Sequence, residues 1–360
     1  MPDPYLQVSA LTKSYGSVTA LGGVSLDVEK GEFVTFLGPS GSGKTTTLMI
    51  IAGFETATSG TVKVGGRSLS NIPPHARNIG IVFQNYALFP HKTALQNIMF
   101  PLNMRGVPAA EAERRARAML DLVGLSDYGG RWPKDMSGGQ QQRIALARAL
   151  VFEPSLLLLD EPLGALDKNM REQMQIEIKR IQKSLGVTTI FVTHDQSEAM
   201  TMSDRIAVFE QGRIDQIGTP QEVYRRPSTP FVARFVGDSN LLPGIVLDPE
   251  DGLVRTEHFG LLRLQDRLPS AIGAKVTLML RPESIHVAEP DARGAADRPN
   301  RAEVNVHTIV PYGESTLLIG RSGGADLRIR LRAQEADGIG SGTSLDVLWP
   351  ASAVHAIPAA

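Results

Sequence analysis

The feature that most constrains this chain is a glycine-rich segment near its N-terminus, Gly38-Pro39-Ser40-Gly41-Ser42-Gly43-Lys44-Thr45. An apolar strand pattern precedes it at 32–37, and a helical pattern follows it at 46–52. In that context glycines let backbone N–H groups converge on phosphate oxygens at the positive end of a helix. The segment predicts a phosphate cradle in which Lys44 reaches the β- and γ-phosphates and Thr45 binds Mg²⁺. An incidental lysine in a glycine-rich turn is the alternative, and the strand–loop–helix context disfavours it.

A second segment, Ser137-Gly138-Gly139-Gln140-Gln141, opens an amphipathic helical pattern at 140–150. Free N–H groups at such a helix start can bind an anion without a lysine. Serine is also a preferred helix N-cap. Taken alone, the segment therefore favours a simple cap over an anion site.

The acidic pair Asp160-Glu161 ends a run of leucines that reads as a buried strand. A carboxylate at the carboxyl end of such a strand can hold Mg²⁺ near the phosphates of a P-loop fold. Glu161 is then placed to polarise an attacking water. The alternative is a carboxylate that caps the turn marked by Pro162 and Gly164. Beside a phosphate cradle we favour the metal and water roles.

Composition excludes several other classes of protein. The 37 basic and 38 acidic residues nearly cancel, which disfavours tight nucleic-acid binding. The chain has no cysteine, so disulfides and thiolate zinc sites are excluded. We see no secretory signal pattern at 1–10 and no apolar run near the ~20 residues that a membrane-spanning helix needs. Any membrane role is therefore expected to act through a partner chain.

The order of patterns along the 360 residues indicates two domains. Alternating strand and helix patterns over 1–236 predict an α/β P-loop domain, with an inserted helical subdomain at about 94–150. Short alternating segments separated by Gly, Pro and Asp over 237–360 predict an all-β, OB-like barrel domain. The polar stretch 289–301 reads as an exposed loop.

Taken in order, Lys44, Gln84, the Ser137 segment, Asp160-Glu161, Asp167 and His194 resemble the ATP-binding-cassette (ABC) ATPases over 5–236. The resemblance implies that two copies pair head to tail, with each ATP between the glycine loop of one and the Ser137 segment of the other. Gln84 would sense Mg²⁺ and the attacking water, Asp167 would communicate across the dimer, and His194 would contact the γ-phosphate.

These arguments lead to an expected set of site residues. Glu161, His194, Lys44 and Gln84 are expected to be catalytic, and Thr45, Gln84 and Asp160 to hold Mg²⁺. The assignment of Tyr15, which would stack on adenine, rests on the family resemblance alone. The residues expected to bind ATP are Tyr15, Gly38, Pro39, Ser40, Gly41, Ser42, Gly43, Lys44, Thr45, Thr46, Ser137, Gly138, Gly139, Gln140 and Asp167.

Two further regions are similar to the importer branch of this family. The stretch 82–100 resembles the surface that receives a coupling helix from a permease, and we expect Tyr86, Leu88 and Phe89 to form an exposed apolar patch there. The segments 280–283 and 311–314 resemble the transport-associated OB-type (TOBE) domain. For that domain we favour structural and dimerisation roles over regulatory ligand binding.

The resemblance implies the ATPase subunit of a bacterial-type importer, peripheral to the cytoplasmic face of the inner membrane. Its partners would be a second copy, two integral-membrane permease subunits and, indirectly, an external solute-binding protein. Residues 190–240 look closest to polyamine (spermidine/putrescine) importer ATPases. Sugar, iron(III) and phosphonate stay open as cargo. So do two other classes, a soluble cassette ATPase of repair or translation and a scaffold whose tail binds a regulator.

Overall fold

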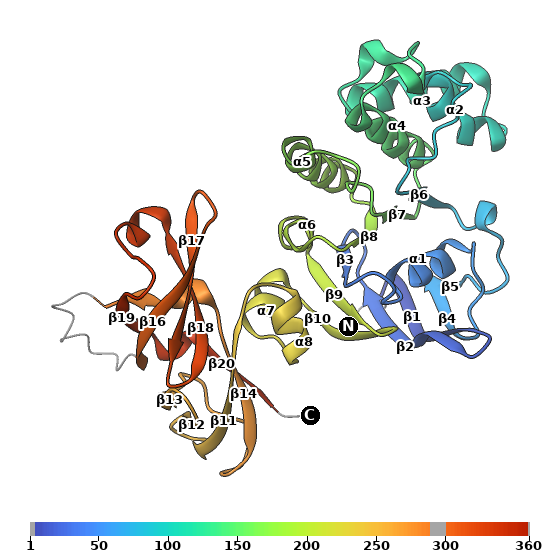
Figure 1. Cartoon of the computed structure of the whole chain (residues 1–360). Helices are drawn as coiled ribbons and strands as arrows, with labels where there is room; N and C mark the ends of the chain where they lie inside the picture. The colour runs from blue at the N-terminus through green and yellow to red at the C-terminus, as the bar shows by residue number, and fades with distance from the viewer. Residues whose placement is uncertain (1–3, 289–299, 359–360) are drawn as a thin grey trace. The chain divides into compact units, whose positions relative to one another are not determined.

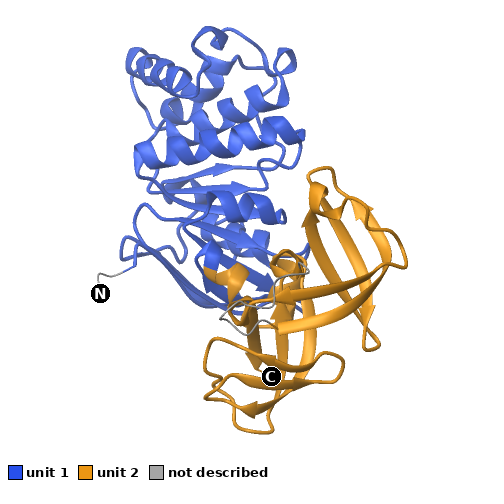
Figure 2. Cartoon of the chain, turned by 90° about the vertical axis from the view of Figure 1, so that its left-hand side faces the viewer, with its two compact units in different colours: residues 1–221 blue, residues 222–360 orange. Residues whose placement is uncertain are grey.

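The computed structural model describes residues 4–288 and 300–358. They form two compact units, Met1–Gln221 and Glu222–Ala360 (Figure 2). The predicted loop at 289–301 lies mostly outside the described residues, and its last two residues, Asn300 and Arg301, begin a strand instead. None of the described helices is both long and apolar enough to cross a membrane.

The first unit is built on a six-stranded sheet with the order β10-β9-β3-β8-β7-β6. Its strands are β3 (Phe33–Leu37), β6 (Ile79–Val82), β7 (Leu156–Asp160), β8 (Thr188–Thr193), β9 (Arg205–Glu210) and β10 (Arg213–Gly218). All neighbours pair in parallel except β9 and β10. Every residue of β3, β7 and β8 is buried, and the leucine run of β7 fits a strand that is covered on both faces.

A second, antiparallel sheet with the order β2-β1-β4-β5 shares a core with the first. Its strands are β1 (Leu6–Tyr15), β2 (Val18–Val28), β4 (Ser59–Val64) and β5 (Arg67–Ser68). Helix α1 (Lys44–Ala52) follows β3 and buries Leu48 and Ile51 in that core. The glycine loop is therefore held between a buried strand and a buried helix.

Three helices form the insertion between β6 and β7: α2 (Ala94–Met104), α3 (Ala109–Leu122) and α4 (Gly138–Leu150) (Figure 1). Ala112, Ala116 and Leu120 are the buried residues of α3, the spacing of one helix face. They join a core with residues of α5 (Lys168–Leu185), which lies after β7. The shorter helices are α6 (Gln196–Met202), α7 (Pro220–Arg225) and α8 (Pro230–Phe235).

The second unit contains two five-stranded antiparallel sheets, ordered β13-β12-β11-β14-β20 and β15-β19-β16-β17-β18. Their strands are β11 (Asn240–Asp248), β12 (Leu253–Thr256), β13 (Gly260–Arg263), β14 (Lys275–Leu280), β15 (His286–Val287), β16 (Asn300–Pro311), β17 (Ser315–Ser322), β18 (Ala325–Arg332), β19 (Ser344–Trp349) and β20 (Val354–Pro358). Both sheets contribute to one core, in which Trp349 is fully buried. The predicted fold class is confirmed: a P-loop α/β domain with a helical insertion, followed by an all-β, OB-like domain.

Arg281 ties the segment before the barrel to the barrel itself. Its Nη1 donates to the carbonyl oxygens of Ala233, Gly237 and Asp238 at 2.9–3.1 Å, and its Nη2 donates to that of Tyr224 at 2.6 Å. Burial lowers the pKa of this guanidinium. These bonds explain why the second unit begins at Glu222, before the change of sequence character near Gly237.

We expect Arg281→Met to destabilise the second unit by about 2–4 kcal/mol, because it leaves buried carbonyl groups without a donor. The measurement is thermal or denaturant unfolding of the full chain. Arg267→Met is the matched control, since Arg267 belongs to the same unit but is exposed and pairs only with Glu250. Equal stability of the two variants would contradict a structural role for the buried guanidinium.

Candidate functional site

The glycine loop adopts a conformation that only small residues allow. Gly41 and Gly43 have positive φ angles of 77° and 101°, in the region that favours glycine. A Cβ atom on Gly38 would lie 2.5 Å from the carbonyl oxygen of Phe209 and 2.8 Å from Ser42 Oγ. The loop therefore keeps its backbone exposed directly before α1 begins at Lys44.

Lys44 is 4% exposed, and none of the carboxylates in the described parts of the chain lies within hydrogen-bonding distance of its ammonium group. Its Nζ donates at 2.8 Å to the carbonyl oxygens of Gly38 and Pro39. Burial lowers its pKa, while Glu161 and Asp160 oppose that shift. Nearby, the buried Ser42 Oγ makes no hydrogen bond within the described residues. A buried cation and an unpartnered hydroxyl fit a loop whose missing partner is an anion such as a phosphate.

Asp160 ends β7 beside the start of α1. Thr45 Oγ1 donates to its Oδ1 at 3.2 Å, and burial raises the pKa of the carboxyl group. Among the described residues no three His, Asp or Glu side chains form a metal cluster. The pair instead offers one hydroxyl and one carboxylate, a donor set that suits Mg²⁺ when phosphate oxygens complete the shell.

At Glu161, which follows β7, side chains from the ends of two neighbouring strands also meet. Gln84, which follows β6, places its Nε2 3.4 Å from Glu161 Oε2. His194, which follows β8, places its Nδ1 3.3 Å from Glu161 Oε1. The backbone of Glu161 has φ 44°, a left-handed conformation that costs a non-glycine residue about 1–2 kcal/mol. Its N–H donates to the carbonyl of Val192 at 3.0 Å, which helps to hold this strained geometry.

The structure thus brings together six of the expected residues: Lys44, Thr45, Gln84, Asp160, Glu161 and His194. They lie at the carboxyl edge of the parallel sheet, where ligands bind in open α/β folds. The remaining loop residues, Pro39, Ser40 and Thr46, are exposed or half-buried around it.

Ser137 and Asp167 lie at the starts of two helices that contact each other. Ser137 Oγ accepts from Gln140 N, and Gln140 Oε1 accepts from Ser137 N, so this segment is a capping box. Asp167 Oδ1 accepts from Met170 N and caps α5. A Cβ on Gly139 would lie 2.5 Å from Met170 Sδ, so a larger residue at this contact between α4 and α5 would displace the Met170 side chain. Within the described parts of the chain, no hydrogen bond or ion pair joins the Ser137 segment to Lys44 or Thr45.

Tyr15 is at the end of β1 and is 49% exposed. Its hydroxyl donates to Glu55 Oε2 at 2.8 Å, and the ammonium of Lys13 lies 4.7 Å from its ring centre. Hydrogen bonds from Lys13 and Tyr15 lower the pKa of Glu55 to about 2. The hydroxyl is thus anchored while much of the side chain remains in solvent.

The expected apolar patch at 86–89 is only partly correct. Tyr86 is 6% exposed, and its ring belongs to the core of the helical region, whereas Leu88 and Phe89 are half-buried. Tyr86 differs from the expectation because its ring packs among the buried residues of the helical region, on a backbone with φ 60°.

Beside this segment lies an open, mainly apolar groove of about 690 Å³ that sequence reasoning missed. Its lining comes from separate segments, including Phe54, Phe83, Phe100, Met104 and Phe152. No local pattern in the sequence marks it, because these residues are far apart along the chain.

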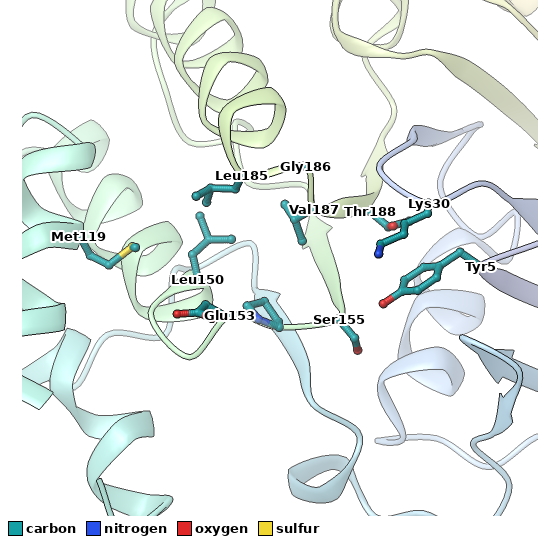
Figure 3. Close-up of a pocket in the computed structure, with 11 residues that line it drawn as sticks. Tyr5, Lys30, Met119, Leu150, Glu153, Ser155, Leu185, Gly186, Val187 and Thr188 are labelled. Atoms are coloured by element: carbon teal, nitrogen blue, oxygen red, sulfur yellow. The ribbon is translucent and has the colours of Figure 1, made fainter. Parts of the chain in front are cut away.

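A smaller cavity of about 250 Å³ is lined by Leu150, Ser155, Leu185 and Thr188, with Tyr5 and Lys30 at its rim (Figure 3). It lies where β7 and β8 begin and α5 ends, the opposite edge of the sheet from Glu161. A helix C-terminus disfavours an anion there.

Two models of known families match the chain. The model described as ABC transporter matches residues 21–164, and the model described as TOBE domain matches residues 278–357.

Similar proteins cover most of the chain. The spermidine/putrescine import ATP-binding protein PotA of Thermobifida fusca is 48% identical over 84% of this chain and 80% of its own length. The protein of the same name from Rubrobacter xylanophilus is 46% identical over 96% of this chain and 92% of its own. The uncharacterized ABC transporter ATP-binding protein YdcT of Escherichia coli is 51% identical over 70% of this chain and 76% of its own.

A solved structure, a dimeric post-hydrolysis state of the ATP-binding cassette MJ0796 bound to ADP and Pi, is 34% identical with a TM-score of 0.54. It covers 60% of this chain and 98% of its own.

The fold and the groups around Glu161 define a P-loop ATPase. Together with these similarities, they show that the chain belongs to the ATP-binding proteins of ABC transporters.

Asp160→Asn is expected to raise the thermal unfolding temperature without nucleotide at pH 7.5. The folded carboxyl has a raised pKa, so its ionised form costs stability above that pKa, and the neutral amide removes the cost. The gain should shrink as the pH falls towards the pKa of Asp160.

Added Mg·ATP should stabilise the variant less than the wild type, because a metal ligand is lost. Asp127→Asn, at an exposed position, is the control, and a larger stability loss in Asp160→Asn than in this control would refute the prediction.

Proposed function

We propose that this chain is the ATP-hydrolysing subunit of an importer for polyamines such as spermidine and putrescine. The observation that carries the proposal is the 46–48% identity to two proteins named as spermidine/putrescine import ATP-binding proteins, over 84–96% of the chain. The convergence of Gln84 and His194 on Glu161 supports the hydrolytic part of it.

In the proposed reaction the glycine loop and Lys44 hold the β- and γ-phosphates of the substrate ATP. Glu161 orients and polarises a water for attack on the γ-phosphorus, with Gln84 fixing that water and His194 contacting the γ-phosphate. As the new bond forms, the bond between the γ-phosphorus and the β–γ bridging oxygen breaks, and ADP and inorganic phosphate leave. Thr45 and Asp160, with Gln84, are the residues that would hold Mg²⁺, which neutralises phosphate charge when bound. Lys44 stabilises the negative charge that develops on the transferred group.

A second copy of the chain completes the site in this proposal. The start of α4 offers backbone N–H groups of Gly138 and Gly139 beyond the Ser137 cap, and Asp167 lies beside them. Such a helix start can bind the γ-phosphate held by the partner's glycine loop. Tyr15, with its exposed ring, is proposed to stack on adenine.

We further propose that two permease subunits hold the chain at the cytoplasmic face of the membrane, with a solute-binding protein outside. The apolar groove is the proposed docking surface for a permease helix, since Phe54 and Met104 are exposed there. The domains are proposed as 1–236 for ATP binding, with a helical subdomain at about 94–150, and 237–360 for dimer support. Neither nucleic acid nor a further cofactor belongs to the proposal.

The cargo is tested by uptake of labelled putrescine and spermidine in cells that lack their own polyamine importers. Cells that carry the wild-type chain with its permeases should accumulate both, and Lys44→Ala should reduce uptake to background because the phosphates lose their buried cation. If the wild type hydrolyses ATP yet supports no polyamine uptake, the cargo assignment is wrong and the same assay is run with sugars, iron(III) and phosphonates.

Met104→Glu should weaken co-purification of the permease and lower uptake at least tenfold, because it places a charge in an apolar docking groove. Met104 is 71% exposed, so the substitution should not impair folding. Ile176→Glu is the matched control, because Ile176 is 72% exposed on α5, outside the groove. Equal uptake by both variants would show that the groove is not the docking surface.

A further inference from the structure

The segment 83–89 contains two consecutive residues in strained backbone conformations. Tyr86 has φ 60° and Ala87 has φ 48°, and neither is a glycine. Such residues persist only where the surroundings fix them. One anchor is the Tyr86 ring, which is buried in the core of the helical region although its hydroxyl has no partner there.

The second anchor is Arg148, near the end of α4. Its Nη2 donates to the carbonyl oxygen of Tyr86 at 2.9 Å, and its Nη1 donates to that of Ala87 at 2.8 Å. A planar guanidinium can bind two neighbouring carbonyls at once, which a lysine does less well. Burial lowers the pKa of Arg148, so keeping the guanidinium charged there costs stability. Its hydrogen bonds go to these two carbonyls.

The segment held in this way faces two sites. On one side Gln84 reaches Glu161 at 3.4 Å. On the other side Phe83, Ala87 and Phe89 line the apolar groove, which Arg148 also lines with its guanidinium 5.6 Å from the Phe89 ring. A shift of Tyr86 or Ala87 would therefore move both the groove wall and Gln84.

We propose that Arg148 is a positioning residue for ATP hydrolysis: by binding the carbonyls of Tyr86 and Ala87, it keeps Gln84 beside Glu161 and connects the groove to the hydrolytic site. The inference rests on the proposed hydrolytic role of Glu161, but not on the cargo. Arg148 thus has a different role from Ser137, which caps the start of the same helix.

The test uses the purified full chain and the variants Arg148→Met and Arg148→Lys. We expect Arg148→Met to lower kcat at least tenfold, while the Kd for ATP measured without Mg²⁺ stays within twofold, because Gln84 is assigned to the metal and the water and not to the phosphate cradle. Arg148→Lys should lie between. Backbone amides at 84–88 should exchange hydrogen at least tenfold faster in Arg148→Met.

Arg115→Met is the matched control, since Arg115 also donates to a backbone carbonyl, that of Val151, at a site away from this segment. It should leave kcat, Kd and exchange at 84–88 within twofold.

A rescue experiment separates positioning from a general loss of structure. In the Arg148→Met background, Ala87→Gly should restore kcat several-fold, because glycine adopts the required φ without strain. Unchanged kcat and unchanged exchange in Arg148→Met would overturn the inference, as would equal losses of kcat and ATP affinity without rescue. Glu161→Gln sets the background rate. A wild-type rate no higher than that background would count against the proposed hydrolytic function, and the exchange measurement would still decide whether Arg148 holds the segment.

Discussion

The contacts around Glu161 are the interaction on which the rest of the site depends. Its carboxylate meets Gln84 from the end of β6 and His194 from the end of β8. These groups come from positions far apart in the chain, and only a parallel sheet places such strand ends at one edge. The buried leucines of β7 fix the position of Asp160 and Glu161 at that edge, so core packing determines the geometry of this site.

Three helix starts share one feature, free backbone N–H groups, but differ in the side chains around it. The helices after Gly43, Ser137 and Asp167 each present free backbone N–H groups. Only the first combines them with a buried lysine, which makes it a phosphate site within a single chain. At the other two helix starts, the capping side chains accept hydrogen bonds from some of these N–H groups. The two helices contact each other through Gly139 and Met170. Both helix starts are exposed, as the proposed binding to a second copy of the chain requires.

Two partly or fully buried arginines show a shared way of fixing irregular backbone. Arg148 binds the carbonyls of a strained segment in the first unit, and Arg281 binds those of the segment before the barrel in the second. A guanidinium suits this task because it donates several hydrogen bonds in a rigid plane. Arg148 binds a turn between a strand and a helix, whereas Arg281 binds carbonyls near the ends of α7 and α8 and in the turn that follows α8.

The sequence by itself determined the α/β and all-β parts, the phosphate cradle and the acidic pair, because these depend on local order: a strand, a glycine loop and a helix, or a leucine run that ends in Asp160. Tertiary structure alone decided which side chains meet. Tyr86 looks like a surface aromatic in sequence but is buried, since its ring packs in the core of the helical region. Arg148 looks like the polar face of an amphipathic helix, yet it binds carbonyls distant in the chain. The groove could not be predicted for the same reason: its walls come from separate segments, and spatial proximity is set by packing rather than by local pattern.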